Sequence, residues 1–428
     1  VGSGCTLVPM TDLPTAFLSL PATDIGLARK LERKIRLIAL RELLSMDGTA
    51  MGVRASHGFS HLQLVVERLA REQPEQMLQV LGHPDVQVPL LVSAAGLRPP
   101  SAILGHLVPA IFAGLSRLGR RLGEAIVWEA PVDVIPVDGH GSFRFDEPAK
   151  AMLVDPSGMA VEFVDGERFN LGGWSSQVHA RIQKSEDWFP LGDPDLELHL
   201  SMRDTNPLAM DEAHPDKSGN AVSLGEKSVA DWTTMLSEAL DLIRLALPDW
   251  YRELAITNQR VLPVGFEPEM HLSASYREAP GIVYMTLHPD PMTMAEALIH
   301  EVQHGKLNRL SWVDPVLHNA YTAWSESPVR PDLRPVMGVL LAVHAFVPVA
   351  AFHHRLAALE HPIAHTQKFA DRRQQVLAGN AGGLGVVEKL GEPSKLGRNV
   401  IQGLRRLHDA VSGGTDQSGW AMDAMPPG

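Results

Sequence analysis

The sequence of 428 residues is poor in cysteine, in aromatic residues and in positive charge. The one cysteine, Cys5, excludes a disulfide framework and leaves no basis for a cysteine zinc site or a thiolate catalyst. Lysine and arginine total 38 against 50 aspartates and glutamates, so the formal net charge is −12 at pH 7. No basic run is present, and we therefore expect no nucleic-acid partner. A net charge of this size is typical of a protein that repels its own copies and stays soluble.

A secretory signal and a long uninterrupted apolar run are also missing from the sequence. The first residues lack a basic segment followed by an apolar core, which is the pattern of a signal peptide. The longest apolar stretches, near 103–116 and 336–352, are short or are interrupted by His106 and His344. We therefore expect a cytoplasmic protein without a membrane partner. The sequence does not indicate an oligomeric state.

What is present is the composition of a folded protein with a large core. Hydrophobic residues make up 45% of the chain and charged residues 21%. Apolar residues recur at helical spacing in two parts of the chain, one before residue 123 and one after residue 227. The expected helices are 24–44, 58–71, 74–81 and 102–122 in the first part, and 228–247, 294–310, 335–358 and 364–378 in the second.

Between these helical parts lies a β-rich region, residues 126–200. Short segments that alternate between apolar and polar residues lead into Asp138-Gly139 and into Asp165-Gly166. Such a segment closed by Asp-Gly predicts a β-hairpin. The polar, turn-rich segment 203–220 that follows is the expected domain boundary.

The most informative feature is an HExxH motif formed by His300, Glu301 and His304. Two histidines four residues apart on a helix lie on the same face, so both imidazoles can bind one metal ion. Glu301 follows the first histidine and can reach whatever occupies an open metal position. The alternative, two surface histidines on an amphipathic helix, would need no metal. We predict a metal site.

The residues before the motif predict where its helix begins. Thr293 and Glu296 have the spacing of a capping box, so the helix is expected to start near Met294. The uncharged segment 281–287 predicts a buried or edge strand. A strand followed by an HExxH helix is the arrangement of zincin metalloproteases, where that strand can pair with an extended peptide. An ordinary core strand is an equally good interpretation of 281–287.

A catalytic metal needs a third protein ligand. His344 is the first candidate, because it lies in an apolar helical segment where a buried histidine needs a polar partner or a metal. Glu326 is the alternative, and would complete the two-histidine, one-carboxylate set of non-haem iron. Glu296 lies too far along the helix to share an ion with both histidines, and its capping role explains it. His353 and His354 are expected at a solvated helix end.

Arg330 and Arg334 lie between the motif and His344, and each is followed by a proline. The guanidinium group binds carboxylates through two parallel hydrogen bonds. Arg334, at the start of the helix that contains His344, is therefore a candidate for binding an anionic cosubstrate beside the metal. An exposed arginine in a proline-rich loop is an equally good interpretation from composition alone.

These features predict an α+β fold that is mainly α. Residues 1–205 are expected to form a helical domain with a small β-rich segment, a candidate for peptide recognition. Residues 222–410 are expected to form a zincin-like helical catalytic domain with the HExxH motif. Residues 411–428 have little pattern and are expected to form a flexible tail.

Several segments around the motif resemble the HExxH-type peptide β-hydroxylases, which are 2-oxoglutarate-dependent iron enzymes associated with ribosomally synthesised, post-translationally modified peptides. The resemblance covers most of residues 75–355. The segments nearest the motif are LIHEVQHGKL (298–307), AWSESP (323–328), LRPVMGVL (333–340) and VHAFVPVA (343–350). The more distant ones are VLGHP (80–84), LGHL (104–107) and HLSAS (271–275).

The resemblance implies Fe(II) bound by His300 and His304, together with His344. It also implies 2-oxoglutarate near Arg334, O₂ as the oxidant, and oxidation at the β-carbon of a residue in a precursor peptide. It changes the expected role of Glu301. A metalloprotease uses that carboxylate as a general base, whereas in an oxygenase it would orient a ligand or the cosubstrate.

Three interpretations of the motif remain open at this point. The first is the iron oxygenase that acts on a precursor peptide. The second is a zincin-type zinc metallopeptidase with Glu301 as general base. The third is a scaffold that keeps a metal site and only binds peptide. A third histidine ligand does not decide between iron and zinc, because zinc also accepts three histidines.

Overall fold

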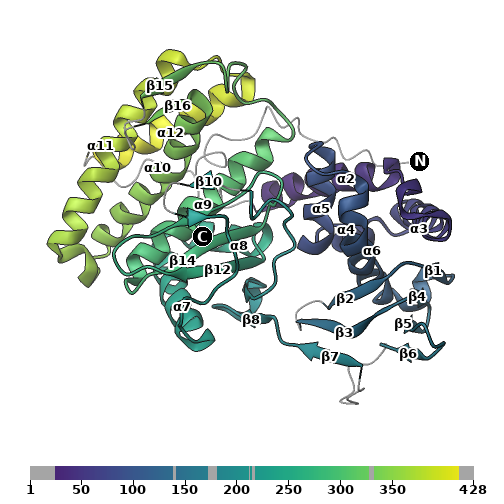
Figure 1. The fold of residues 1–428 in the computed structure, drawn as a ribbon. Coiled ribbons are helices and arrows are strands. Elements are labelled where there is room, and N and C mark those ends of the chain that lie inside the picture. The colour runs from purple at the N-terminus through teal and green to yellow at the C-terminus, as the bar shows by residue number, and fades with distance from the viewer. Residues whose placement is uncertain are drawn as a thin grey trace, which may run out of the picture.

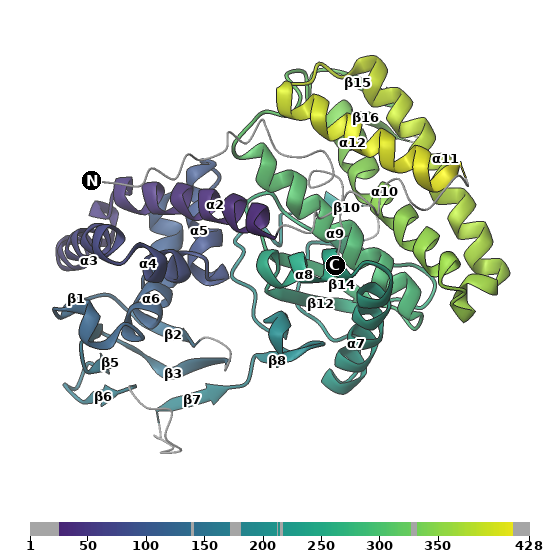
Figure 2. The ribbon, with the colours of Figure 1, turned by 180° about the vertical axis from the view of Figure 1, so that it is seen from behind.

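The computed structural model describes residues 25–137, 141–171, 181–211, 213–214, 217–326 and 332–413. Its α+β architecture, with helices predominating, agrees with the predicted fold class. The N-terminal helices and their two sheets lie beside the C-terminal half, which holds a five-stranded sheet and the longest helices (Figures 1 and 2).

The N-terminal helices form a layer above two small sheets (Figure 1). They are α2 (Gly26–Ser45), α3 (Val53–Glu72), α4 (Pro74–Leu81), α5 (Pro84–Ala94) and α6 (Pro100–Ser116). The predicted helices 24–44, 58–71 and 74–81 are confirmed, whereas the predicted helix 102–122 ends at Ser116 and is followed by a 3₁₀ turn, η3 (Gly119–Leu122). The sequence does not predict α5, because its residues are buried on every side and show no amphipathic period.

The β-rich region contains two antiparallel sheets. One has the order β1 (Ile126–Trp128), β4 (Ala151–Asp155), β5 (Gly158–Glu162) and β6 (Arg168–Asn170). The other has the order β2 (Val132–Val137), β3 (Gly141–Ala149) and β7 (Ile182–Ser185). Both predicted hairpins are confirmed by pairing, β2 with β3 and β5 with β6. The turn residues 138–139 of the first lie outside the described residues.

The C-terminal half is built around a five-stranded sheet with the order β13-β14-β12-β9-β8. Its strands are β8 (Trp188–Pro190), β9 (His199–Ser201), β12 (Arg260–Phe266), β13 (Ser273–Ala274) and β14 (Ile282–Leu287). The predicted strand 281–287 is confirmed as the core strand β14. It pairs with β12 on one side and β13 on the other, so β13, not β14, forms the edge of the sheet near the motif.

Long helices cover this sheet and extend beyond it. They are α7 (Val229–Ala246), α8 (Pro248–Thr257), α9 (Pro291–Ser311), α10 (Val336–Ala358), α11 (Gln367–Leu390) and α12 (Lys395–Ser412). The predicted helices 228–247, 294–310 and 335–358 are confirmed. The predicted helix 364–378 corresponds to the first part of the longer α11. The predicted tail 411–428 begins too early, because α12 continues to Ser412, and its residues after 413 lie outside the described residues. Short strand pairs form between β10 (Ala213–His214) and β11 (Lys217–Ser218), and between β15 (Trp324–Glu326) and β16 (Leu333–Pro335).

The motif helix α9 begins three residues earlier than predicted, at Pro291. The Asp290 carboxylate caps it by accepting a hydrogen bond of 2.9 Å from the Met292 N–H. Proline suits the first helical position because its missing N–H would have no helical partner there. The predicted capping box of Thr293 and Glu296 is therefore wrong, since both residues lie inside the helix.

The hydrophobic core is continuous across the two halves of the chain. The cluster around α7, α9, α10 and the five-stranded sheet also includes Leu27 and Leu31 of α2. A smaller cluster joins Val88 of α5 to Leu262 of β12 and Tyr284 of β14. The division into domains 1–205 and 222–410 stays a prediction.

Helix α10 is the one helix in the described part of the chain that is long and apolar enough to cross a membrane. It has 23 residues, so the expectation that this stretch is too short was wrong. Of its most apolar stretch, 78% is buried inside the protein. That burial is typical of a core helix of a soluble protein.

Candidate metal centre

Helix α9 runs through the core, in contact with α7, α10 and β14. Four charged side chains on this one helix are buried, Glu296, Glu301, Lys306 and Arg309. A buried charge is costly unless a partner neutralises it. Three of the four have such a partner: Glu296 contacts Arg372, Lys306 contacts Glu253, and Arg309 contacts Glu32.

Glu301 differs from these three, because no cation of the described residues forms an ion pair with it. It is 3% exposed. Its Oε1 accepts a hydrogen bond of 2.6 Å from the Ser273 hydroxyl on the edge strand β13. Its Oε2 is buried and has no hydrogen-bond partner. A buried carboxylate with one unsatisfied oxygen is compatible with a site for a cation.

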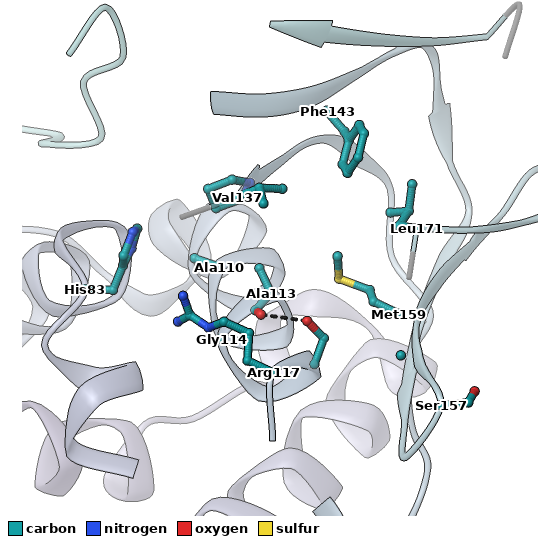
Figure 3. A pocket seen from close by; sticks show the side chains of 13 residues that line it. His83, Ala110, Ala113, Gly114, Arg117, Val137, Phe143, Ser157, Met159 and Leu171 are labelled. Atoms are coloured by element: carbon teal, nitrogen blue, oxygen red, sulfur yellow. Dashed lines mark hydrogen bonds between the residues drawn. The ribbon is translucent and has the colours of Figure 1, made fainter. Parts of the chain in front are cut away.

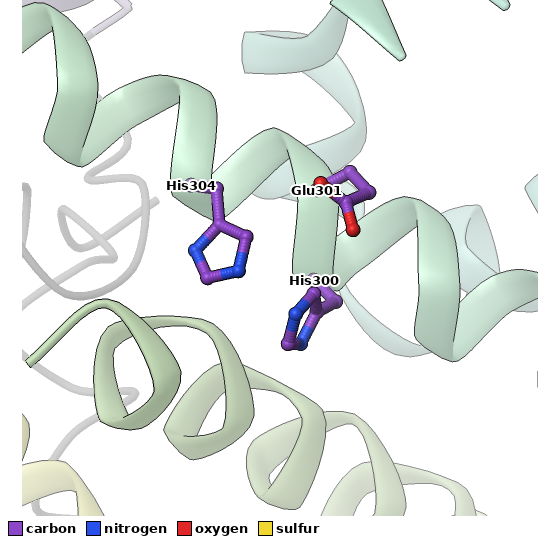
Figure 4. Close-up of side chains that lie close together, drawn as sticks. All are labelled: His300, Glu301 and His304. Atoms are coloured by element: carbon purple, nitrogen blue, oxygen red, sulfur yellow. The ribbon is translucent and has the colours of Figure 1, made fainter. Parts of the chain in front are cut away.

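The two motif histidines supply the other groups of this site. Metal-binding atoms of His300, Glu301 and His304 all lie within 4.8 Å of one another. The two imidazole centroids are 4.3 Å apart, with the rings inclined by 76°. Figure 4 shows both rings on the same side of α9, pointing toward a neighbouring helix, with Glu301 beside His300. The i, i+4 spacing therefore brings these side chains together as predicted.

The protonation of His304 favours metal binding. Burial is the main cause that lowers its pKa; the charge of Glu301 opposes this shift and the charge of Arg334 adds to it. The imidazole is therefore neutral at pH 7, which is the form that binds a metal. Its Nδ1 is buried without a hydrogen-bond partner, as is Oε2 of Glu301. Nitrogen and carboxylate ligands of this kind suit ferrous iron and zinc alike.

His344 lies on α10 and is fully buried. Its backbone carbonyl accepts a hydrogen bond of 3.5 Å from Gln303, and Gln303 in turn accepts one of 3.1 Å from the Trp250 indole. The first contact joins α10 to the motif helix α9, and the second joins α8 to it. The imidazole of His344 does not belong to the cluster of metal-binding atoms around His300 and His304. Its role as third ligand stays a prediction.

The alternative ligand, Glu326, is exposed at the end of β15 and does not belong to that cluster either. Phe346 is a residue of the site that the sequence does not predict, and it contacts His300 directly. Its ring centroid lies 4.5 Å from that of His300, and it comes two residues after His344 on α10. A pocket of about 300 Å³ lies beside this ring, lined also by Arg372, Gln375 and Asn380 among others.

Arg334 lies on β16, directly before α10, and its guanidinium Nε donates a hydrogen bond of 3.2 Å to Asp332. The Arg334 side chain is 31% exposed and that of Asp332 is 56% exposed, so their ion pair is open to solvent. The positive charge of Arg334 contributes to the lowered pKa of His304. Arg330 lies outside the described residues. Arg277 packs on the Trp312 ring, with 4.4 Å from its guanidinium carbon to the ring centroid.

Two expectations near the motif are wrong. His353 does not lie at a solvated helix end but is fully buried, and its Nε2 lies 2.8 Å from Oε1 of Glu296. Glu296 is not a capping residue but joins α9 to α10 through His353 and to α11 through Arg372. Burial would raise the pKa of Glu296, but the His353 hydrogen bond and the Arg372 charge outweigh it and lower that pKa. His354, the next residue, is half-buried.

Comparison with known proteins places the chain in no family. No protein-family model matches it. No curated protein matches it in sequence.

Proposed function

We propose that this protein is a ferrous iron and 2-oxoglutarate-dependent oxygenase that hydroxylates the β-carbon of a residue in a ribosomally made precursor peptide. The proposal combines the metal cluster on α9 with the resemblance of its surroundings to the HExxH-type peptide β-hydroxylases. Its setting would be the cytoplasm, where such peptides are made.

The observation that supports the proposal most strongly is the state of Glu301. Three of the four buried charges on α9 are neutralised by other side chains, and Glu301 is not. A cation between its carboxylate and the two imidazoles would neutralise it and satisfy its buried Oε2. Nothing about packing alone calls for a charged residue at this position, because an apolar side chain there would cost less.

His300 and His304 would hold the iron, with His344 as the proposed third ligand. Bound iron would supply the electron transfer to O₂ that the C–H bond of a peptide cannot undergo by itself. The overall reaction balances as peptide C–H, O₂ and 2-oxoglutarate giving peptide C–OH, succinate and CO₂. The contribution of the chain is to bind the metal, to hold the two carboxylates of the cosubstrate, and to exclude water from the reacting carbon.

Arg334 is the proposed partner of the distal carboxylate of 2-oxoglutarate. Arg330 is the alternative candidate for this role. Arg334 is close enough to influence His304 electrostatically, and its present partner Asp332 is largely exposed. An anionic cosubstrate can therefore displace Asp332 at little cost, since an exposed ion pair contributes only about 0–1 kcal/mol.

The proposal is tested by metal analysis of protein purified without oxygen, followed by an O₂-consumption assay. The proposal requires iron near one equivalent and O₂ consumption that depends on 2-oxoglutarate. Zinc in place of iron, with no 2-oxoglutarate dependence, would reject it.

The alternative is a zincin-type zinc metallopeptidase in which Glu301 is the general base. The order of β14 followed by α9, and a carboxylate oxygen available beside the histidines, favour this alternative. A general base must lie within hydrogen-bond reach of a metal-bound water, and the position of Glu301 is compatible with that. Peptide cleavage by the zinc-loaded protein would support it.

A further inference from the structure

The edge strand β13 borders the metal cluster and has one open side. It pairs with β14 on its inner side, and no strand of the described residues pairs with its outer side. It contacts the motif helix α9, where the Ser273 hydroxyl donates a hydrogen bond of 2.6 Å to Oε1 of Glu301. An extended chain can therefore add a strand to the outer side of β13, next to the metal cluster.

The register of β13 determines which of its backbone groups face outward. In an antiparallel pair, residues that exchange hydrogen bonds with the partner strand alternate with residues that do not. Leu272 is of the first kind, because its carbonyl accepts a hydrogen bond of 2.8 Å from the Thr286 N–H. Ser273, which lies opposite Met285, is of the second kind. The backbone N–H and C=O of Ser273 therefore point away from β14, toward the outer side.

The side chains of this segment alternate between the two faces of the sheet. Ala274 and Tyr276 pack in the small core cluster on the face that α5 covers. Ser273 points to the opposite face, where it contacts Glu301. In a strand added to β13, the residue directly opposite Ser273 has its side chain on this same face, with its β-carbon about 5 Å from that of Ser273.

We propose that the substrate peptide binds as an added strand on the outer side of β13, with the residue to be oxidised directly opposite Ser273. The reaction at that residue rests on the proposed function, whereas strand addition itself requires neither iron nor 2-oxoglutarate. The arrangement presents a β-carbon to the face of the sheet that holds Glu301 and the two motif histidines. Main-chain hydrogen bonds to Ser273 provide affinity that depends little on the peptide sequence.

The N-terminal half offers a different place for a peptide. A cavity of about 490 Å³ lies between α6, the β2–β3 hairpin and β5, and Figure 3 shows Ala113 of α6 in its lining. None of its lining residues belongs to the metal cluster. A peptide confined to this cavity would therefore not contact the metal centre, and Ala113→Phe, which puts a ring into the cavity, separates the two locations.

The test begins with affinity selection of peptides from a random pool of acetylated octapeptide amides on the full-length protein. Each retained peptide is resynthesised with a single N-methyl group at each position in turn, and its Kd is measured by isothermal titration calorimetry. N-methylation should weaken binding roughly three- to ten-fold at alternate positions of the bound segment, where the amide N–H faces β13, and should have no effect at the positions between them. No retained peptide, or N-methyl effects that do not alternate, would overturn the proposal.

Two variants of Ser273 place the bound peptide at β13. Ser273→Pro removes the outward N–H, and an edge strand accepts proline where the N–H faces away from the sheet. It should weaken binding of the retained peptides roughly three- to ten-fold. Ser273→Ala keeps that N–H and is the matched control, with peptide affinity as in the parent protein. Weaker binding in Ala113→Phe and unchanged binding in Ser273→Pro, each with an unchanged melting temperature, would contradict the proposal.

Incubating the retained peptides with the ferrous protein, 2-oxoglutarate and O₂ tests the proposed function separately. A gain of one oxygen supports the oxygenase. Peptides that show the alternating N-methyl effect but gain no oxygen support strand addition at β13 and count against the oxygenase. Peptides that gain oxygen without any alternation overturn strand addition and leave the oxygenase supported.

Discussion

The Ser273 hydroxyl donates a hydrogen bond of 2.6 Å to Oε1 of Glu301. This contact joins the edge strand β13 to the motif helix across 28 residues of sequence. It fixes one carboxylate oxygen and leaves the other, Oε2, without a hydrogen-bond partner. In the proposed metal centre, Ser273 would therefore be a positioning residue that acts through Glu301.

Replacing Ser273 by alanine should leave iron binding intact and slow turnover. A hydrogen bond to a charged group contributes about 1.5–3 kcal/mol, and a loss at the lower end corresponds to roughly a ten-fold lower kcat. The measurement is 2-oxoglutarate-dependent O₂ consumption together with iron content. Ser275→Ala, two residues along the chain, is the control. Unchanged kcat in Ser273→Ala would remove this residue from the site.

Removal of either motif histidine should abolish metal binding and activity. His300→Ala and His304→Ala each delete one of the two imidazoles in the cluster. Metal content is measured after reconstitution with ferrous iron in the absence of oxygen. His318→Ala is the control, because His318 is exposed and lies outside the cluster. One equivalent of metal in either motif variant would refute the site.

The third ligand is tested by comparing His344→Ala with Glu326→Ala. We expect His344→Ala to lower metal affinity sharply and to preserve the fold, because apolar side chains surround it on α10. Glu326→Ala should bind iron like the parent protein, since Glu326 is exposed on β15. The opposite result, loss of metal only in Glu326→Ala, would establish a carboxylate ligand and require β15 to move toward α9.

The cosubstrate requirement should depend on Arg334. Losing a charge-assisted contact of about 2 kcal/mol would raise the KM for 2-oxoglutarate roughly 30-fold in Arg334→Ala. Iron binding should persist, and Arg334→Lys should restore part of the affinity because a lysine cannot form the bidentate contact. Asp332→Asn should not raise the KM, since it removes a competitor for Arg334. An unchanged KM in Arg334→Ala would show that Arg334 does not bind the cosubstrate and would leave Arg330 and Arg277 as the candidates.

Glu296 should make the stability of the protein sensitive to acid. Its pKa in the folded protein lies below its ordinary value of 4.5, so it binds a proton less readily when folded than when unfolded. Its contribution is therefore complete above pH 4.5 and is lost as the pH falls through the folded pKa. Glu296→Gln should cost about 3–5 kcal/mol at pH 7 and less at pH 4. Urea unfolding at both pH values measures this, with the exposed Glu238→Gln as control.

Prediction from the sequence was correct for features that depend on residues close together in the chain. The pairing of His300 with His304 follows from helical geometry alone, and the strand β14 follows from its uncharged, β-branched residues. The α+β class follows from the change between helical and alternating patterns. These features depend on residues that are close together in the chain.

The sequence could not predict features that depend on distant segments. Ser273 and Phe346 contact the candidate metal centre although they lie 28 and 46 residues away in sequence from their partners Glu301 and His300. Glu296 has the spacing of a capping residue, yet its actual partners His353 and Arg372 come from α10 and α11. Helix α5 is buried on every side, which removes the periodicity by which a helix is recognised.

The most direct test of the proposed function is the binding of 2-oxoglutarate to the protein under anaerobic conditions. Calorimetry would compare the ferrous, zinc-loaded and metal-free forms, with His304→Ala as control. The proposal predicts that the ferrous form binds one equivalent of 2-oxoglutarate and that the metal-free form binds it much more weakly. In His304→Ala, the addition of iron should not strengthen 2-oxoglutarate binding. If iron does not strengthen 2-oxoglutarate binding, the central claim is contradicted.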